Sequence, residues 1–365
     1  MSPVPRFERV QQALRETELD AIALVPGPNL TYVSGARLHR SERLNLLVIP
    51  REGSPRVLCP LLEAAAYRHL GVPLHTWRDE EGPHSALQQL VAEAGLARAV
   101  WGVEYANAYY GEVLAIQEVA PGARFQPADE VLTRLRVVKD ADEIVALRRA
   151  AELTGRVVLE AVEAVRPGLT EREVAAMIQV ALLKHGSEGM AFSPLVASGP
   201  NAADPHALPS NRVLQPGDIV ILDAGGVVEG YQGDITRCVA LKPVSDEVRQ
   251  MYAVVSRAAE AGRAAVRPGV AAQDVDRAAR QVIEEAGYGD YFIHRTGHGL
   301  GLQVHEPPYI AEGNTQKLEP GMVFTVEPGI YVPGVGGVRV EDVVVVTEQG
   351  CDVLTNVSRS LFERE

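Results

Sequence analysis

The stretch VRPGLTEREVAAMIQVALLKHG, from Val165 to Gly186, occurs a second time as VRPGVAAQDVDRAARQVIEEAG, from Val266 to Gly287. The two stretches align without gaps, and in each a Pro-Gly turn comes before a helical pattern that ends at glycine. Self-similarity of this kind indicates a repeated structural unit. The part of the chain after about residue 140 is therefore predicted to contain two equivalent halves.

Strand patterns repeat in the same order after these helices. LQPGDIVILDAGG, which begins at Leu214, aligns with LEPGMVFTVEPGI, which begins at Leu318. In both, a Pro-Gly turn leads into an apolar run that is typical of a buried strand. With a short insertion in the second half, the alignment pairs four acidic residues, two from each half: Asp223 with Glu327 and Asp234 with Glu341.

These acidic residues lie in segments that are otherwise apolar. A single Asp at the end of a strand is more often a turn residue. Four carboxylates brought together in a buried place, however, cannot all stay ionised without compensating cations. His298 in RTGHGLG would add one nitrogen ligand to this oxygen-rich set, a mixture that suits manganese, cobalt or zinc. We therefore predict a metal centre.

Two further histidines occupy matching places in the repeat, His206 in DPHALP and His305 in QVHEPP. Their function would be to donate hydrogen bonds to a developing oxyanion or to carry protons. Arg339 lies two residues before Glu341 and on a strand would face the same side. It would either neutralise the acidic cluster or hold a carboxylate of the substrate.

Composition narrows the class of protein. A length of 365 residues suggests two domains, and a hydrophobic share of 46% with 23% charged residues is typical of a globular protein. The net charge of −13 argues against a nucleic-acid partner. No apolar run suits a membrane span and the start lacks a signal-peptide core, so we expect a cytoplasmic protein with no membrane partner. Three scattered cysteines predict neither disulfides nor a thiolate site.

The first third of the chain alternates between helical and strand patterns, which indicates a small α/β domain. Asp140 is placed to cap a long helix that runs to Val165. The predicted domains are residues 1–135 and residues 136–365, and the predicted fold class is α/β (α+β).

With LDAGG, GDITR, GHGLGLQVHEPP, VEPGIY and VRVED in this order, the chain resembles the pita-bread metallopeptidases, in the branch of proline dipeptidase (prolidase) and aminopeptidase P. The resemblance covers the whole chain. It implies a small amino-terminal creatinase/prolidase-like domain followed by a pita-bread catalytic domain with an internal pseudo-twofold repeat. It also implies a homodimer and short peptide substrates.

The resemblance implies a role for each candidate residue. A hydroxide that bridges two divalent ions would attack the peptide carbonyl, and the ions would be Mn²⁺, with Co²⁺ or Zn²⁺ as alternatives. Glu327 would also move the proton of the attacking water. His206, His305 and Arg339 would contact the substrate. The implied metal ligands are Asp223 for one ion, His298 and Glu327 for the other, and Asp234 and Glu341 for both.

Two exopeptidase activities stay open. The shorter chain length favours cleavage of Xaa-Pro dipeptides, and the alternative is an aminopeptidase P that releases the first residue of longer Xaa-Pro peptides. Arg40, in the polar loop ARLHRSERLN, is predicted to come from a dimer partner and to bind the free carboxylate of a dipeptide. Three alternatives rank lower. Methionine aminopeptidase usually lacks an amino-terminal domain of this size, and creatinase and a metal-free peptide-binding module lack the ligand set that this chain retains.

Overall fold

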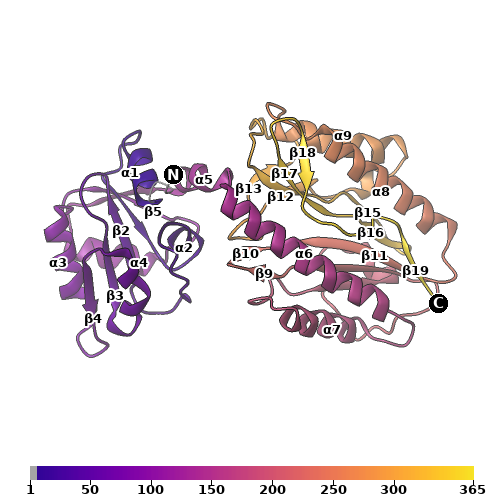
Figure 1. Ribbon diagram of the computed structural model, residues 1–365, viewed down its shortest axis with the longest axis horizontal. Helices are drawn as coiled ribbons and strands as arrows, with labels where there is room; N and C mark the ends of the chain where they lie inside the picture. The colour runs from indigo at the N-terminus through magenta and orange to yellow at the C-terminus, as the bar shows by residue number, and fades with distance from the viewer. Residues whose placement is uncertain (1–5) are drawn as a thin grey trace. The chain divides into compact units, whose positions relative to one another are not determined.

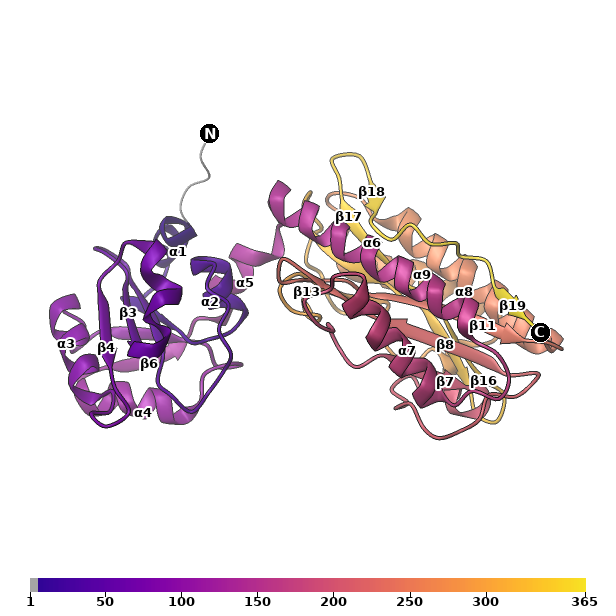
Figure 2. The same cartoon turned by 60° about the horizontal axis from the view of Figure 1, so that its bottom comes forward.

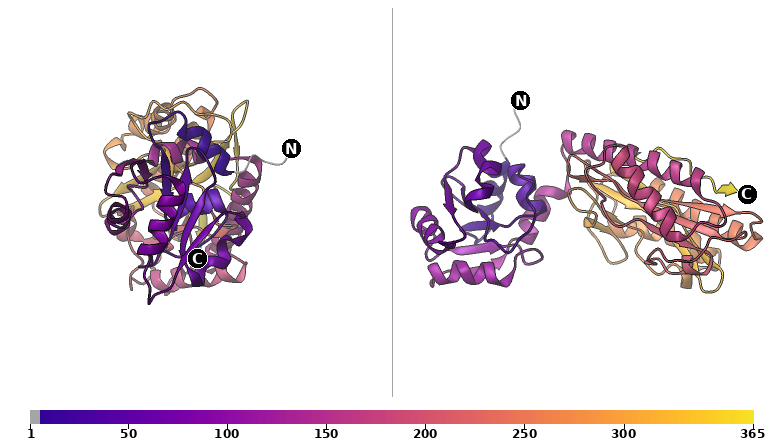
Figure 3. Two further views of the ribbon diagram at one scale, coloured as in Figure 1. Left: turned by 90° about the vertical axis from the view of Figure 1, so that its left-hand side faces the viewer. Right: turned by 90° about the horizontal axis from the view of Figure 1, so that it is seen from below.

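The computed structural model describes residues 6–365, and the chain divides into two compact units, Met1–Arg136 and Val137–Glu365. The boundary predicted from the sequence lies between residues 135 and 136, one residue before this division. Figures 1 and 3 show the first unit in indigo to magenta and the second in magenta to yellow. No helix of the described residues is long and apolar enough to span a membrane.

The first unit is a mixed six-stranded sheet with helices packed against it. Its strand order is β4-β3-β2-β1-β5-β6, with β1 parallel to β5 and antiparallel to β2. Its strands are β1 (Ala21–Leu24), β2 (Leu46–Pro50), β3 (Arg56–Pro60), β4 (Leu74–Trp77), β5 (Val100–Val103) and β6 (Arg124–Pro127). Its helical elements are α1 (Arg6–Leu14), α2 (Pro28–Ser34), the 3₁₀ segment η1 (Leu61–Leu70), α3 (His84–Ala94), α4 (Tyr110–Val119) and α5 (Asp129–Val137), whose last residue crosses the division.

The long helix predicted after Asp140 is confirmed as α6 (Ala141–Ala164). The Asp140 carboxylate accepts the backbone N–H of Glu143, and the Glu143 carboxylate accepts the backbone N–H of Asp140. This reciprocal capping satisfies two N–H groups that the first turn of a helix would otherwise leave unpaired. The remaining helical elements of the second unit are α7 (Glu171–Lys184), η2 (Gly199–Ala203), α8 (Asp246–Ala265), α9 (Ala272–Glu285) and η3 (Gly289–Tyr291).

The sequence repeat is a structural repeat. Gly168 N donates to Leu214 O at 3.0 Å, and Gly269 N donates to Leu318 O at 2.8 Å, at the same place in each half. The Pro-Gly turns before the helices match in backbone conformation, since Gly168 has φ 93° and Gly269 has φ 80°. Residues that carry a side chain rarely adopt this left-handed backbone conformation, which explains the glycine in both copies.

The strands of the second unit form two main sheets, β19-β11-β8-β7 and β13-β12-β14-β17-β18, and two short hairpins. In Figure 2 the helices α6 and α7 lie along the strands β8 and β11, and the C-terminal strand β19 lies beside β11. The strands are β7 (Leu195–Ser198), β8 (Ile219–Ala224), β9 (Val227–Val228), β10 (Tyr231–Gln232), β11 (Ile235–Leu241), β12 (Gly297–Gly299), β13 (Glu306–Ile310), β14 (Val323–Val326), β15 (Gly329–Val332), β16 (Gly336–Arg339), β17 (Asp342–Val346), β18 (Cys351–Val353) and β19 (Phe362–Arg364).

Both faces of the β8/β11 pair are covered by apolar side chains. Val220 and Leu222 pack with α6 and α7 on one face, while Ile219 and Ile221 pack with α8 and β16 on the other. A strand buried on both faces reads as a continuous apolar run, as DIVILD does. Asp223 near the end of this run is therefore an acidic residue in an otherwise apolar, buried strand.

Candidate metal centre

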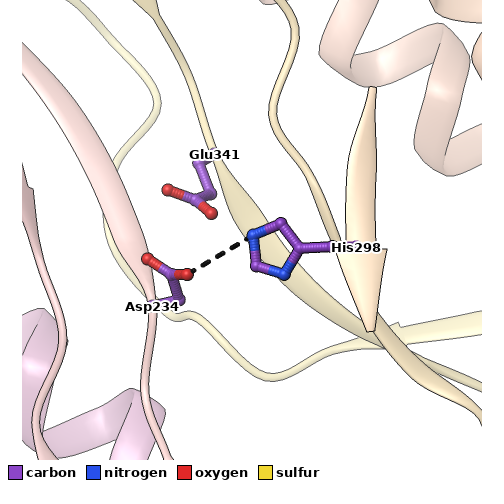
Figure 4. Close-up of side chains that lie close together, drawn as sticks. All are labelled: Asp234, His298 and Glu341. Atoms are coloured by element: carbon purple, nitrogen blue, oxygen red, sulfur yellow. Dashed lines mark ion pairs between the residues drawn. The ribbon is translucent and has the colours of Figure 1, made fainter. Parts of the chain in front are cut away.

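Asp234, His298 and Glu341 bring one ligand atom each to a common point. These atoms lie within 4.8 Å of one another, and all three residues are buried. Figure 4 shows the two carboxylates and the imidazole converging from three segments of the chain, with the ion pair between Asp234 and His298 marked. Two carboxylates and one imidazole in a closed group of this size can hold a divalent ion.

The acidic residues lie at the ends of strands of both halves. Asp223 is in β8, opposite Thr236 of β11 in the antiparallel register, and Asp234 precedes β11 by one residue. Glu327 directly follows β14, and Glu341 directly precedes β17. The pairing of carboxylates across the repeat thus corresponds to equivalent strand ends of the two sheets.

Glu327 and Asp223 lie beside this three-residue group. His298 Nε2 is 3.2 Å from Glu327 Oε1 and 3.7 Å from Asp234 Oδ2. Asp223 accepts a hydrogen bond from Arg339 Nη2 through Oδ2, at 2.6 Å. Its other oxygen, Oδ1, is buried and has no hydrogen-bond partner among the described residues.

The electrostatics of the cluster favour the binding of cations. Burial, followed by the charges of neighbouring carboxylates, raises the pKa of Asp234 and of Glu341 well above the usual range. Burial also raises the pKa of Asp223, against the effect of Arg339. For Glu327 burial opposes ionisation, but the hydrogen bond and charge of His298 lower its pKa to about 2.

The donor set fits divalent metal ions. Buried polar atoms normally have partners, so the unpartnered Asp223 Oδ1 requires one. Bound cations would also reverse the unfavourable ionisation of Asp234 and Glu341. All five residues predicted to be ligands gather at one end of the two sheets: Asp223, Asp234, His298, Glu327 and Glu341.

A second layer of side chains orients these residues. The Thr236 hydroxyl donates to Glu341 Oε2 at 2.7 Å and accepts from Arg339 Nε at 3.1 Å. Arg339 also donates to the Tyr331 hydroxyl at 2.8 Å, in addition to its bond with Asp223. All three guanidinium nitrogens of Arg339 are thus engaged, which favours the first of its two predicted roles, neutralising the acidic cluster.

The centre lies in the wall of a pocket of about 730 Å³. His206 and His305, both predicted from the sequence, line this pocket. The His305 ring stands edge-on to the His298 ring, with 4.1 Å between centroids. Partial burial, followed by the electrostatic effects of the neighbouring His298 and Arg295, lowers the pKa of His305 to about 4, so the ring is neutral at physiological pH.

Sequence reasoning missed three residues at or beside this pocket, namely His294, Arg295 and Tyr331. His294 Nε2 lies 2.9 Å from the Tyr331 hydroxyl, and burial lowers the pKa of His294. Arg295 lines the pocket with its guanidinium carbon 4.5 Å from the centre of the Tyr309 ring. His294 and Arg295 directly precede TGHGLG, so their position beside the candidate ligand His298 was the available signal.

Arg40 belongs to the first unit, where it has partners of its own. Its Nη2 donates to Glu112 Oε2 at 2.7 Å, and its guanidinium carbon lies 4.2 Å from the centre of the Tyr109 ring. Arg43 of the same loop is paired with Asp79. The predicted contact of Arg40 with a substrate carboxylate stays a prediction.

Two family models match the chain, one for each unit. Residues 6–138 match the creatinase/prolidase N-terminal domain, and residues 145–348 match metallopeptidase family M24. The second match covers more than half of the chain and includes all five candidate ligands. The chain belongs to metallopeptidase family M24.

Relatives match over nearly their whole length. The chain is 42% identical to the probable dipeptidase PepE of Mycobacterium tuberculosis, over 98% of this chain and 95% of that protein. It is 31% identical to a Xaa-Pro dipeptidase of Pyrococcus horikoshii, over 98% of each. Among solved structures, a recombinant prolidase from Thermococcus sibiricus superposes with a TM-score of 0.94 at 37% identity and 100% coverage of both chains.

Proposed function

We propose that this chain is a Xaa-Pro dipeptidase that uses two divalent metal ions. The observation that carries the proposal is the cluster of four carboxylates and His298, with Asp234, Glu341 and His298 buried, in the wall of a pocket large enough for a dipeptide. Dipeptidases and prolidases among the relatives support the substrate class. Divalent ions bound in this cluster would polarise the scissile carbonyl and lower the pKa of the attacking water.

The chain's own residues would supply binding and proton transfer. Glu327, which lines the pocket and lies beside His298, would accept the proton of the attacking water. The rings of His206 and His305 line the same pocket and would donate hydrogen bonds to the oxygen that gains charge. Arg339 would hold Asp223 in place through its hydrogen bond.

The pocket has an apolar side that suits a proline ring. Phe192, Pro194 and Leu208 line it together with the histidines. An Xaa-Pro bond lacks the amide N–H that strand-like docking of a peptide requires, so a ring pocket and a bound free amine suit this substrate better. Arg295 adds positive charge to the lining of the pocket, where a dipeptide's carboxylate would be favoured.

The second candidate is an aminopeptidase P that acts on longer Xaa-Pro peptides. A Xaa-Pro aminopeptidase from Thermotoga maritima superposes with a TM-score of 0.86 at 32% identity, over 97% of this chain and 100% of that one. Both activities use the same centre and differ in whether the pocket admits residues after proline. We favour the dipeptidase because the relatives matched over their full length include several named Xaa-Pro dipeptidases.

A mass-spectrometric time course separates the candidates. The purified protein, supplied with Mn²⁺, is incubated with a mixture of Ala-Pro, Ala-Pro-Gly and Met-Ala-Gly. The dipeptidase proposal predicts that Ala-Pro disappears first and that Ala-Pro-Gly persists. Rapid loss of Ala-Pro-Gly would identify an aminopeptidase P, and loss of Met-Ala-Gly alone a methionine aminopeptidase.

The proposal extends to the metal, the assembly and the compartment. Mn²⁺ is our choice for the working ion, with Co²⁺ or Zn²⁺ as alternatives, because the donors are four carboxylates and one imidazole. We propose a cytoplasmic homodimer that acts on short peptides and has no nucleic-acid or membrane partner.

Arg40 of the partner copy would bind the peptide carboxylate. Replacing Arg40 and Arg43 by alanine would then reduce Xaa-Pro cleavage or admit longer peptides, and a variant that did neither would contradict this part.

A further inference from the structure

Lys139 and Glu306 form a buried ion pair directly beside the loop that carries His305. Lys139 Nζ lies 3.0 Å from Glu306 Oε1, and the two side chains are 1% and 5% exposed. Glu306 follows His305 in the chain and begins β13. Neither Lys139 nor Glu306 lines the pocket described above.

The Glu306 carboxylate is the centre around which this loop folds. Its Oε2 accepts the backbone N–H of Gln303 at 3.3 Å, while Gly301 N donates to Gln303 O at 3.0 Å. A Cβ atom added at Gly301 would come within 2.6 Å of Glu306 Oε1, so the backbone of the loop packs directly on the carboxylate. The course of residues 300–305 therefore depends on where Glu306 is held.

Lys139 is fixed at its other end to the sheet that supplies metal ligands. Its backbone N–H donates to Gly321 O at 2.9 Å, and Val138 forms an antiparallel bridge with Met322. Met322 directly precedes β14, the strand that leads to Glu327. The ion pair thus connects the His305 loop to the ligand-bearing sheet, at a place outside the metal centre.

His305 has no fixing contact of its own that could replace this connection. Among residues 6–365, no hydrogen bond to its ring is found, and its ring contact is the edge-on packing against His298. The position of the ring is therefore set by the backbone of its loop. An error of about 1 Å in the position of a catalytic group can reduce the rate about 100-fold.

The energetics of buried ion pairs also indicate that this pair fixes a geometry and does not mainly add stability. Removing two charges from water costs about as much as their attraction returns, so an apolar pair of similar size would stabilise the fold equally well. What a charge-assisted hydrogen bond adds is a defined geometry. We propose that Lys139 and Glu306 are a positioning pair that sets the place of His305 for the substrate. This inference rests on the proposed peptidase function.

The test is a mutant cycle with His305. Lys139→Met, His305→Ala and the combination are compared by kcat and KM for Ala-Pro in Mn²⁺. We expect Lys139→Met to lower kcat/KM about 10- to 100-fold in the wild-type background and less than about 3-fold in the His305→Ala background, since its effect acts through His305. Equal losses in both backgrounds, or wild-type activity of Lys139→Met, would overturn the proposal.

A matched variant separates positioning from stability. Lys139→Met with Glu306→Leu replaces the ion pair by apolar side chains, and we expect its Tm to recover relative to Lys139→Met alone while kcat/KM stays low. Recovery of kcat/KM together with Tm would mean that the pair is only structural. Lys139→Arg keeps the charge and is expected to retain more activity than Lys139→Met.

A measurement that does not depend on catalysis distinguishes the positioning pair from the proposed peptidase function. Hydrogen exchange followed by mass spectrometry is expected to be faster in Lys139→Met for peptides covering residues 299–306, and unchanged for peptides covering α7. Unchanged exchange in residues 299–306 would count against the positioning pair. A wild-type protein that cleaves none of the peptides would count against the proposed function instead.

Discussion

The Thr236 hydroxyl lies between two groups of the metal centre, since it donates to Glu341 Oε2 and accepts from Arg339 Nε. Partners of metal ligands orient the ligand and raise its affinity for the ion. We expect Thr236→Val, which keeps the shape and removes the hydroxyl, to weaken Mn²⁺ binding about 10- to 100-fold. Isothermal titration calorimetry of the metal-stripped protein measures this.

Thr296→Val is the matched control for that experiment. Thr296 is buried next to the segment that carries His298, but its Oγ1 has no hydrogen-bond partner among the described residues. Its replacement should leave the affinity for Mn²⁺ within about 3-fold of wild type. If Thr236→Val bound Mn²⁺ as tightly as Thr296→Val does, Thr236 would have no orienting role.

The raised pKa values of Asp223, Asp234 and Glu341 have a consequence for stability. Free Asp and Glu ionise near about pH 4, whereas these folded groups retain their protons at higher pH. The folded state then binds more protons than the unfolded state, so the metal-free protein loses stability as pH rises above about 4 towards the folded pKa values.

Divalent ions reverse this loss because they compensate the ionised carboxylates. We therefore predict that the gain in Tm on adding Mn²⁺ is larger at about pH 7.5 than at about pH 5. Differential scanning fluorimetry with and without Mn²⁺ gives both values. A gain of equal size at the two pH values would mean that the three carboxylates are ionised in the metal-free fold.

At the scale of elements, the strand β17 is joined to distant segments through the buried Asp342. Its carboxylate accepts hydrogen bonds from Arg237 Nη2 of β11 at 2.8 Å and from Arg263 Nη1 of α8 at 2.8 Å. Arg237 itself is fully buried and also donates to the backbone carbonyl of Glu341. Two further donors reach the same carboxylate, Thr355 Oγ1 and Arg359 Nε.

We expect Asp342→Asn to destabilise the protein by about 3–5 kcal/mol, because it leaves the buried Arg237 without its ionic partner. Urea unfolding monitored by circular dichroism measures the change. The control is Asp352→Asn on the neighbouring strand, where the pair with Arg148 is exposed and contributes at most about 1 kcal/mol. Equal effects of the two variants would contradict the assigned role of Asp342.

The elements also show which parts of the fold were predictable. The Pro-Gly turns before α7, α9, β8 and β14 are local patterns, so their places could be predicted from the sequence. The network around Asp342 could not be, since its donors come from three segments far apart in the chain, and nothing in VRVED separates Asp342 from Glu341. Asp234 lies one residue before β11. The pattern of apolar residues does not determine at which residue this strand begins.

At the scale of the whole molecule, the candidate site was predictable to the extent that it follows the repeat. Duplicated strand ends provide Asp223, Asp234, Glu327 and Glu341, and the alignment of the two halves predicts their pairing. His294 and Tyr331 belong to the same site but have no counterparts that a repeat would reveal. Their mutual contact arises from the packing of β15 beside the segment before β12, which only the folded chain contains.

The central claim is that both halves of the molecule contribute ligands to one two-metal centre. Titration of the metal-stripped protein with Mn²⁺ tests it most directly, with bound metal measured by inductively coupled plasma mass spectrometry and Ala-Pro hydrolysis measured in the same samples. We predict two ions per chain at saturation and no hydrolysis without metal. Fewer than one ion per chain, with no activity restored by added Mn²⁺, would contradict the claim and favour a metal-free peptide-binding module.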